Sequence, residues 1–193
     1  MNVNGLILAA GESSRLGQPK QLVKYNNIHL VNSIENQLSH LCQKVYMVLG
    51  ANYQIIVNHI KKAEVIHNKH WQQGMHSSLS CGILHAKDDA EGILIALSDQ
   101  PLIPQCHYQI LLETFKKKPE HIIATQYANI LGVPAVFPQS FFDALQNKCS
   151  INQGAQSIIK NNRDRVYPVP CELAEFDLDT PEQLKTLQIL SKK

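Results

Sequence analysis

The chain begins with the stretch that decides its fold, Val3-Asn4-Gly5-Leu6-Ile7-Leu8-Ala9-Ala10-Gly11-Glu12-Ser13-Ser14-Arg15-Leu16-Gly17-Gln18-Pro19-Lys20. The apolar run 3–9 predicts a strand, and the small and polar residues after it predict a loop. A buried strand that empties into such a loop presents free backbone N–H groups at the carboxyl end of a sheet, where α/β proteins bind phosphates. Arg15 and Lys20 add two cations. The stretch therefore predicts a site for a phosphate chain.

Two familiar phosphate-binding motifs do not fit this loop. A P-loop requires G-x-x-x-x-G-K-[ST], but Gly11 and Gly17 are six residues apart and Gln-Pro-Lys follows the second. A dinucleotide fingerprint requires G-x-G-x-x-G, which fails because Glu12-Ser13 follows Gly11. An ordinary βα turn with two solvated cations is the remaining alternative.

The composition is that of one globular domain spanning residues 1–193, with 44% apolar and 18% charged residues. A net charge of +2 with scattered basic residues does not point to nucleic acid as a partner. The five cysteines are odd in number and form no C-x-x-C pair, which argues against a disulfide framework or a structural zinc site. The N-terminus enters a strand without a signal peptide, and no apolar run approaches a membrane span. We therefore expect a cytoplasmic protein without a membrane partner.

Apolar strands alternate with helix-length amphipathic stretches along the chain. The predicted strands are 3–9, 45–49, 64–67, 92–97, 122–125, 133–137 and the edge strand 166–169, and the predicted helices are 30–41, 53–60, 79–86, 108–115, 141–146 and 156–160. Thr180-Pro181-Glu182-Gln183 predicts the capped start of a final helix. The order predicts an α/β fold, a single-domain three-layer α/β/α arrangement of Rossmann-like type with a mixed, mostly parallel sheet.

Three carboxylates are expected beside the loop from Ala10 to Lys20, which is called the phosphate loop below. Asp99 follows the strand 92–97, at the same end of a parallel sheet as the loop. Asp177 and Asp179 alternate in an extended segment and therefore point to one side. Carboxylates there can hold Mg²⁺ against bound phosphates. The alternative is that these residues cap helices. Asp99 would then cap a helix that begins near Pro101, and Asp177 and Asp179 would cap the final helix.

The block from Trp71 to Gly82 opens a helix with a glycine turn at Gly74 and the serine pair Ser77-Ser78. Such a start offers N–H groups and hydroxyls to a polar ligand edge. Ser77 as the N-cap of a core helix fits equally well. His67-x-x-His70 is a conceivable metal pair, but polar loop histidines are the favoured interpretation because no third ligand is clearly placed.

The stretch from Leu8 to Lys20 resembles the signature of the nucleotidyltransferases that share a fold with sugar-phosphate nucleotidyltransferases. Its Ala9-Ala10-Gly11 and Gln18-Pro19-Lys20 variants are most similar to molybdenum cofactor cytidylyltransferases, whereas the guanylyl branch more usually has Ala-Gly-Gly and an Asp before the Lys. Asp99-Gln100-Pro101 and the acidic block from Asp177 to Glu182 resemble further blocks of the same family. The resemblance therefore reaches the C-terminus.

The resemblance implies a sheet of the nucleotidyltransferase type and an Mg²⁺-dependent enzyme. It implies transfer of a nucleoside monophosphate from an NTP, with CTP favoured, to a phosphorylated acceptor, with molybdopterin favoured, and release of pyrophosphate. The implied catalytic residues are Arg15, Lys20 and Asp99, and the implied metal ligands are Asp99 with Asp177 or Asp179. The implied nucleotide contacts are Ala9, Ala10, Gly11, Ser13, Ser14, Arg15, Lys20, Gly74, Ser77 and Ser78.

The acceptor side departs from the family pattern at three positions. Val133, Asn152 and Gln156 stand where the cytidylyltransferases usually have His, Asp and Arg. The acceptor half therefore carries fewer polar and charged groups than the resemblance implies. The alternatives are the same chemistry with GTP or with a sugar or polyol phosphate, and a nucleotide-binding chaperone or regulator of a molybdoenzyme without turnover.

Overall fold

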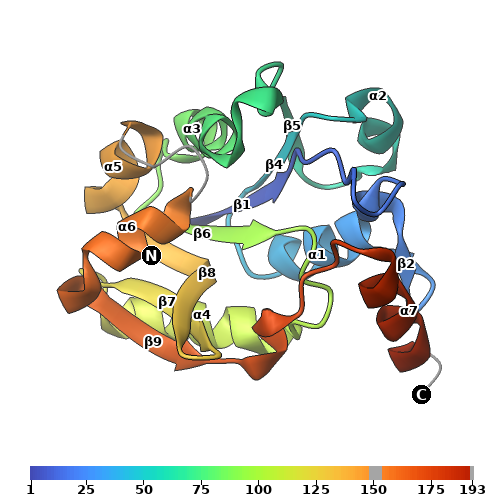
Figure 1. Cartoon of the computed structure of the whole chain (residues 1–193). Coiled ribbons are helices and arrows are strands. Elements are labelled where there is room, and N and C mark those ends of the chain that lie inside the picture. The colour runs from blue at the N-terminus through green and yellow to red at the C-terminus, as the bar shows by residue number, and fades with distance from the viewer. Residues whose placement is uncertain (148–153, 192–193) are drawn as a thin grey trace.

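A seven-stranded mixed sheet with the strand order β5-β4-β1-β6-β8-β7-β9 lies between two layers of helices (Figure 1). The computed structural model describes residues 1–147 and 154–191. The strands of the sheet are β1 (Val3–Ala9), β4 (Val45–Leu49), β5 (Glu64–His67), β6 (Gly92–Leu97), β7 (Ile122–Tyr127), β8 (Ile130–Pro138) and β9 (Val166–Pro170), and a small separate hairpin is formed by β2 (Lys24–Tyr25) and β3 (Ile28–His29). The predicted three-layer α/β fold is confirmed.

Strand β8 is the element that makes the sheet mixed. The pairs β1–β4, β1–β6, β4–β5 and β7–β9 are parallel, whereas β8 pairs antiparallel with both β6 and β7. Ala128 and Asn129 both have positive φ, and their turn joins β7 and β8 into a hairpin. The strands predicted at 122–125 and 133–137 extend into this hairpin, which places β8 between β6 and β7. Strand β9 lies at the edge, as predicted, and carries Pro168 and Pro170.

The helices cover both faces of the sheet. One face carries α1 (Leu30–Ser39), α2 (Tyr53–Ile56) and α4 (Gln105–Lys117), and the other carries α3 (Met75–Ala86), α5 (Phe142–Asn147) and α6 (Ala155–Asn161). Alternate residues of β1 serve the two faces, since Leu6 and Leu8 belong to the core under α3 while Ile7 belongs to the core under α1. Within the described residues 1–147 and 154–191, no helix has the length and apolar character to cross a membrane.

Two predicted helix starts and the extent of a third predicted helix need correction. Helix α3 begins at Met75 rather than 79, and α4 begins at Gln105, with Pro104 at its N-cap, rather than at 108. Asp99 therefore lies too far from α4 to cap it. The segment predicted as one helix at 53–60 divides into α2 and a 3-10 turn.

The C-terminal helix α7 (Pro181–Leu190) holds the acidic segment against the phosphate loop. Thr180 caps α7 in a full capping box with Gln183, as predicted. A third apolar cluster joins this end of the chain to the loop through the buried side chains of Leu16, Val23, Leu30, Leu178 and Leu187. The backbone N–H of Leu178 donates to the carbonyl of Asp99 at 2.8 Å. Leu178 therefore fixes its two acidic neighbours at the carboxyl end of β6.

Leu178→Ala is expected to lower the free energy of unfolding by about 2–5 kcal/mol, because it empties a fully buried leucine site. Leu190→Ala is the matched control, since Leu190 is 37% exposed and its truncation is expected to cost less than about 0.5 kcal/mol. Urea unfolding of both variants measures the difference. Equal effects would show that this cluster does not hold the C-terminal segment.

Candidate active site

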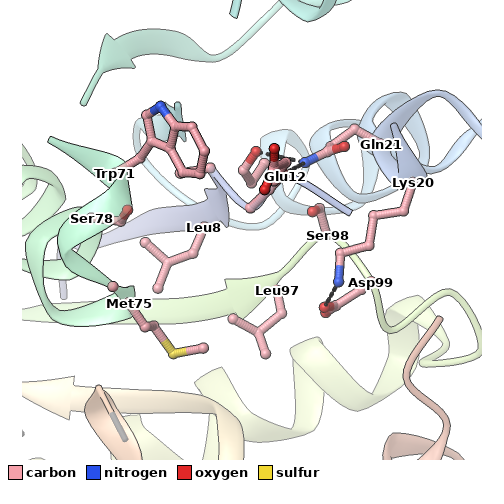
Figure 2. A pocket seen from close by; sticks show the side chains of 14 residues that line it. Leu8, Glu12, Lys20, Gln21, Trp71, Met75, Ser78, Leu97, Ser98 and Asp99 are labelled. Carbon is pink, nitrogen blue, oxygen red and sulfur yellow. Dashed lines mark hydrogen bonds and ion pairs between the residues drawn. The ribbon is translucent and has the colours of Figure 1, made fainter. Parts of the chain in front are cut away.

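The carboxyl ends of β1 and β6 open onto a cavity of about 270 Å³ (Figure 2). Its lining includes seven of the residues predicted from the sequence: Ala9, Ala10, Gly11, Lys20, Gly74, Ser78 and Asp99. It also includes residues that the sequence did not single out: Leu8, Glu12, Gln21, Trp71, Met75, Leu97 and Ser98. The phosphate loop, the start of α3 and the end of β6 therefore meet at one cavity.

The phosphate loop is shaped by two side chains that bind its own backbone. Gln21 is fully buried, and its Nε2 donates to the carbonyls of Ala9 at 2.9 Å and Gly11 at 3.1 Å. Ser13 has a φ of 61°, and its Oγ accepts from the N–H of Lys20 at 3.1 Å. A Cβ added at Gly11 would meet nothing within 4 Å, so the backbone there is open. Ser13 and Ser14 do not line the cavity.

Lys20 lies between two of the predicted acids. Its Nζ donates to Asp99 Oδ2 at 2.6 Å and to Asp179 Oδ1 at 2.7 Å, and its side chain is only 12% exposed (Figure 2 shows the pair with Asp99). Burial alone would lower the pKa of Lys20, but the charge of Asp99 and the hydrogen bonds to both carboxylates outweigh it and raise the pKa. Lys20 therefore carries its charge at neutral pH.

Arg15 pairs with the same acidic segment from the solvent side. Its Nη2 donates to Asp179 Oδ2 at 2.9 Å, and its side chain is 71% exposed. Burial alone would raise the pKa of Asp179, but the hydrogen bonds and charges of Lys20 and Arg15 overcome this effect and lower the pKa. Both oxygens of Asp179 are thus engaged by cations.

Asp99 and Asp177 each present a carboxylate oxygen without a partner. Asp99 Oδ1 and Asp177 Oδ1 are buried and accept no hydrogen bond from the part of the chain that the structure describes. Burial, and next the charge of Asp99, raise the pKa of Asp177 to about 6, although the Gln100 amide opposes this. Buried acceptors of this kind are rare unless a ligand or ion satisfies them. The two oxygens are therefore suited to a cation.

The serine pair is divided between two tasks. The Nδ2 of the buried Asn68 donates to Ser77 Oγ at 2.9 Å and to Ser78 Oγ at 3.0 Å. Ser77 Oγ in turn donates to the carbonyl of His70 at 2.9 Å, and Ser77 does not line the cavity. Gly74, with a φ of 94°, is the N-cap of α3, so the alternative that Ser77 caps this helix is wrong. Ser78 is the serine that faces the cavity.

A second cavity of about 180 Å³ adjoins the first and shares Leu8, Met75 and Leu97 with it. Its other lining residues are Ile95, Gln100, Tyr127, Gly132, Val133, Ala155, Gln156 and Asp177. Two of the three positions that depart from the family pattern, Val133 and Gln156, therefore lie at one cavity. Asn152 lies outside the described residues.

Tyr127 lines the second cavity together with Asp177. Burial, and then the charges of Asp177 and Asp99, raise its pKa. A Cβ at Gly132 would lie 2.9 Å from the Tyr127 hydroxyl, so the glycine leaves room for the ring. The phenol therefore stays protonated at neutral pH and is available as a hydrogen-bond donor.

Gln21, Asn68 and Tyr127 are three of the site residues that sequence reasoning missed. Gln21 follows the signature directly, and Asn68 directly follows β5. These positions are the only local signals, because the partners of both side chains come from other elements. Tyr127 ends β7, and its place at the site depends on the hairpin with β8 that the sequence pattern does not fix.

The described residues contain no metal site made of three or more protein ligands. Across residues 1–147 and 154–191, no group of three or more His, Cys, Asp or Glu side chains is arranged to hold a metal ion. His67 stacks on Tyr53 with ring centroids 3.8 Å apart, consistent with the favoured interpretation of a polar histidine. Two carboxylates remain compatible with Mg²⁺, which is usually held by one or two carboxylates together with water and substrate phosphates.

An α/β/α sheet that brings a phosphate loop and carboxylates together at its carboxyl edge defines a nucleotidyltransferase-type protein. Residues 5–166 match the MobA-like NTP transferase domain family, and the chain belongs to this family of nucleotidyltransferases. A probable molybdenum cofactor guanylyltransferase of Trichormus variabilis is 25% identical, over 97% of this chain and 91% of the relative.

Solved structures agree on the fold. The Rv0371c protein of Mycobacterium tuberculosis H37Rv superposes with a TM-score of 0.82 at 22% identity, over 96% of this chain and 97% of that one. Rv0371c has also been solved as a complex with manganese, which superposes with a TM-score of 0.78 at 20% identity, over 97% and 98% of the two chains.

Asp177→Asn is expected to stabilise the metal-free protein by about 1–2 kcal/mol at pH 7.5, a value reduced for solvent screening because Asp177 is only partly buried. Folding raises the pKa of Asp177 to about 6, so the cost of its charge grows as the pH rises from its unfolded pKa of about 4. The gain should therefore vanish below about pH 4.

Urea unfolding in EDTA at a series of pH values measures this effect. Asp88→Asn, at an exposed position, is the control and should show no such pH dependence. A loss of stability in Asp177→Asn at pH 7.5 would contradict the account in which burial and the charge of Asp99 disfavour the ionised Asp177.

Proposed function

We propose that the chain transfers a nucleoside monophosphate from a nucleoside triphosphate to a phosphorylated acceptor, with Mg²⁺ and release of pyrophosphate. The observation that carries the proposal is that two adjoining cavities, which share Leu8, Met75 and Leu97, are each lined by one acid. Asp99 lines the first cavity and Asp177 lines the second. In this proposal the triphosphate occupies the first cavity and the acceptor enters through the second.

Asp99 and Asp177 are the proposed metal ligands. Their unpartnered buried oxygens fit a divalent cation, whereas both oxygens of Asp179 are engaged by Lys20 and Arg15. The manganese complex of the mycobacterial protein supports a divalent metal at this fold. Bound Mg²⁺ would neutralise charge on the phosphates during transfer. This assignment separates the two acids that the sequence left as equal alternatives.

Besides binding the metal, the protein would align the acceptor phosphate with the triphosphate and neutralise charge on the phosphates. An acceptor phosphate is already ionised and needs no general base. The open backbone at Gly11 would receive the triphosphate, and Lys20 would stabilise charge on it from its position between the acids. Arg15, which lines neither cavity but is exposed beside Asp179, would contact the leaving pyrophosphate. Ala9, Ala10, Gly74 and Ser78 are proposed to surround the base and ribose, while Ser13, Ser14 and Ser77 would support the walls.

Cytosine and guanine are the two candidate bases. The Ala9-Ala10-Gly11 and Gln18-Pro19-Lys20 motifs favour CTP. The name of the cyanobacterial relative, a probable molybdenum cofactor guanylyltransferase, favours GTP. The methyl group of Ala10, which lines the first cavity, narrows the space beside β1 and is the physical reason to expect the smaller base.

Molybdopterin is the proposed acceptor, supported by the family resemblance and by the same relative. A molybdoenzyme would then be the downstream partner that takes up the product. A sugar or polyol phosphate stays as the second candidate, because Val133 and Gln156 give the acceptor cavity an uncharged wall. A binding protein without turnover predicts nucleotide binding without pyrophosphate release, so the assay below separates it from both enzymes.

Asp99→Asn is expected to lower the rate of pyrophosphate release by about 100-fold or more, since losing one anionic ligand removes charge stabilisation of several kcal/mol. The assay uses a panel of acceptors, namely purified molybdopterin and sugar and polyol phosphates, with Mg²⁺ and each of the four triphosphates. The control Asp88→Asn should keep the wild-type rate. Near-normal turnover of Asp99→Asn with unchanged Mg²⁺ dependence would refute the assignment.

Competition between CTP and GTP for one acceptor tests the choice of base. We expect a preference for CTP of roughly 10- to 200-fold, the range that contacts to one small group provide. Ala10→Gly, which removes the methyl group, should weaken the preference. A wild-type preference for GTP would reject the cytidylyl proposal and leave the guanylyl candidate.

A further inference from the structure

A third cavity, of about 190 Å³, adjoins the acceptor cavity. Gln156 lines both cavities, and the neighbouring residues Leu131 and Gly132 of β8 line the third and the second respectively. The other residues of the third cavity are Asn129, Ile130, Ile159, Lys160 and Arg163. The two cavities therefore meet along one edge of α6 and β8, which pack together in Figure 1.

The third cavity carries positive charge that the acceptor cavity lacks. The described lining of the acceptor cavity contains no Lys, Arg or His, and its one ionisable carboxylate is Asp177. Lys160 and Arg163 line the third cavity, and neither forms an ion pair within residues 1–147 and 154–191. Two cations that stand together without a carboxylate partner attract an anion.

Gln156, Lys160 and Arg163 follow one another along the lining of the third cavity. Gln156 and Lys160 are spaced at i and i+4 on α6, Arg163 begins the 3-10 turn that follows this helix, and all three are exposed. Gln156 thus lies at the boundary between a cavity without cations and a cationic one. A ligand that leaves the acceptor cavity past Gln156 would reach Lys160 and Arg163 next.

We propose that Lys160 and Arg163 form a second anion-binding subsite, which holds a negatively charged group at the end of the acceptor opposite its reacting phosphate. This inference rests on the proposed function, and it defines the acceptor class further. The acceptor has a phosphate at the metal site, an uncharged and largely apolar body in the second cavity, and a second anionic group at α6.

Matched synthetic probes test the subsite without turnover. The probes are monophosphates of linear alkanediols of increasing length, each paired with the corresponding bisphosphate. Isothermal titration is done with Mg²⁺ and a CTP analogue bridged by methylene between its α- and β-phosphates. The proteins are the wild type, the double variant Lys160→Ala with Arg163→Ala, and the control Lys116→Ala with Lys117→Ala, which removes two exposed charges from the end of α4.

We expect the wild type and the control to bind the bisphosphate more tightly at one or more lengths. The Lys160/Arg163 variant should lose roughly 3- to 30-fold in this preference, the range for two exposed ion pairs, and keep its affinity for the monophosphate. Lys160→Glu should weaken bisphosphate binding further. A wild type without preference at any length, or a preference that survives in the double variant, would overturn the subsite.

The failure of the proposed function gives a different result. In that case no acceptor releases pyrophosphate from any triphosphate, and Asp99→Asn changes nothing. The bisphosphate preference does not require turnover, because it compares the binding of two probes that differ only in the group placed at Lys160 and Arg163.

Discussion

The ion pairs of Lys20 hold the two ends of the chain together at the site. Lys20 lies 79 residues from Asp99 and 159 residues from Asp179 in sequence, yet its ammonium group contacts both carboxylates. Without this cation, the acids at the end of β6 and ahead of α7 would repel each other in a partly buried setting. The apolar cluster around Leu178 supplies the packing that keeps these charges in place.

This arrangement leaves charge for a ligand to satisfy. Lys20 and Arg15 neutralise Asp179 and one oxygen of Asp99, but the inward oxygens of Asp99 and Asp177 have no partner among the described residues. The raised pKa of Asp177 is the energetic sign of the same imbalance. A divalent cation bound with substrate phosphates would correct it, which is why the proposed function assigns the metal to these two acids.

Much of the fold can be predicted from the sequence because its core strands are apolar runs bounded by turns. The bounds of β1, β4, β5 and β6 agree with the prediction. β1, β4 and β6 are largely apolar runs, whereas β5 has only Val65 and Ile66 between Glu64 and His67. The place of β8 between β6 and β7 cannot be predicted in this way. Hydrophobic periodicity indicates where a strand lies in the sequence, but not which strands it pairs with. The turn at Ala128 and Asn129 decides it, and neither residue is a glycine that would mark such a turn.

The candidate site likewise has a part that the sequence predicts and a part that it does not. Asp99 and the loop from Ala9 to Lys20 are predictable, since the end of a parallel strand fixes where they lie. The sequence does not reveal that Lys20 faces carboxylates, or that Gln21 and Asn68 brace the walls, because these contacts join elements far apart in the chain. Side-chain partners of this kind become visible only in three dimensions.

The metal assignment is tested most directly by the anomalous scattering of manganese in crystals of the protein grown with Mn²⁺ and the methylene-bridged CTP analogue. The account predicts one peak that contacts the carboxylates of both Asp99 and Asp177, with Asp179 still paired to Lys20 and Arg15. A peak at Asp179 instead, or an ordered nucleotide with no peak at Asp99, would contradict it.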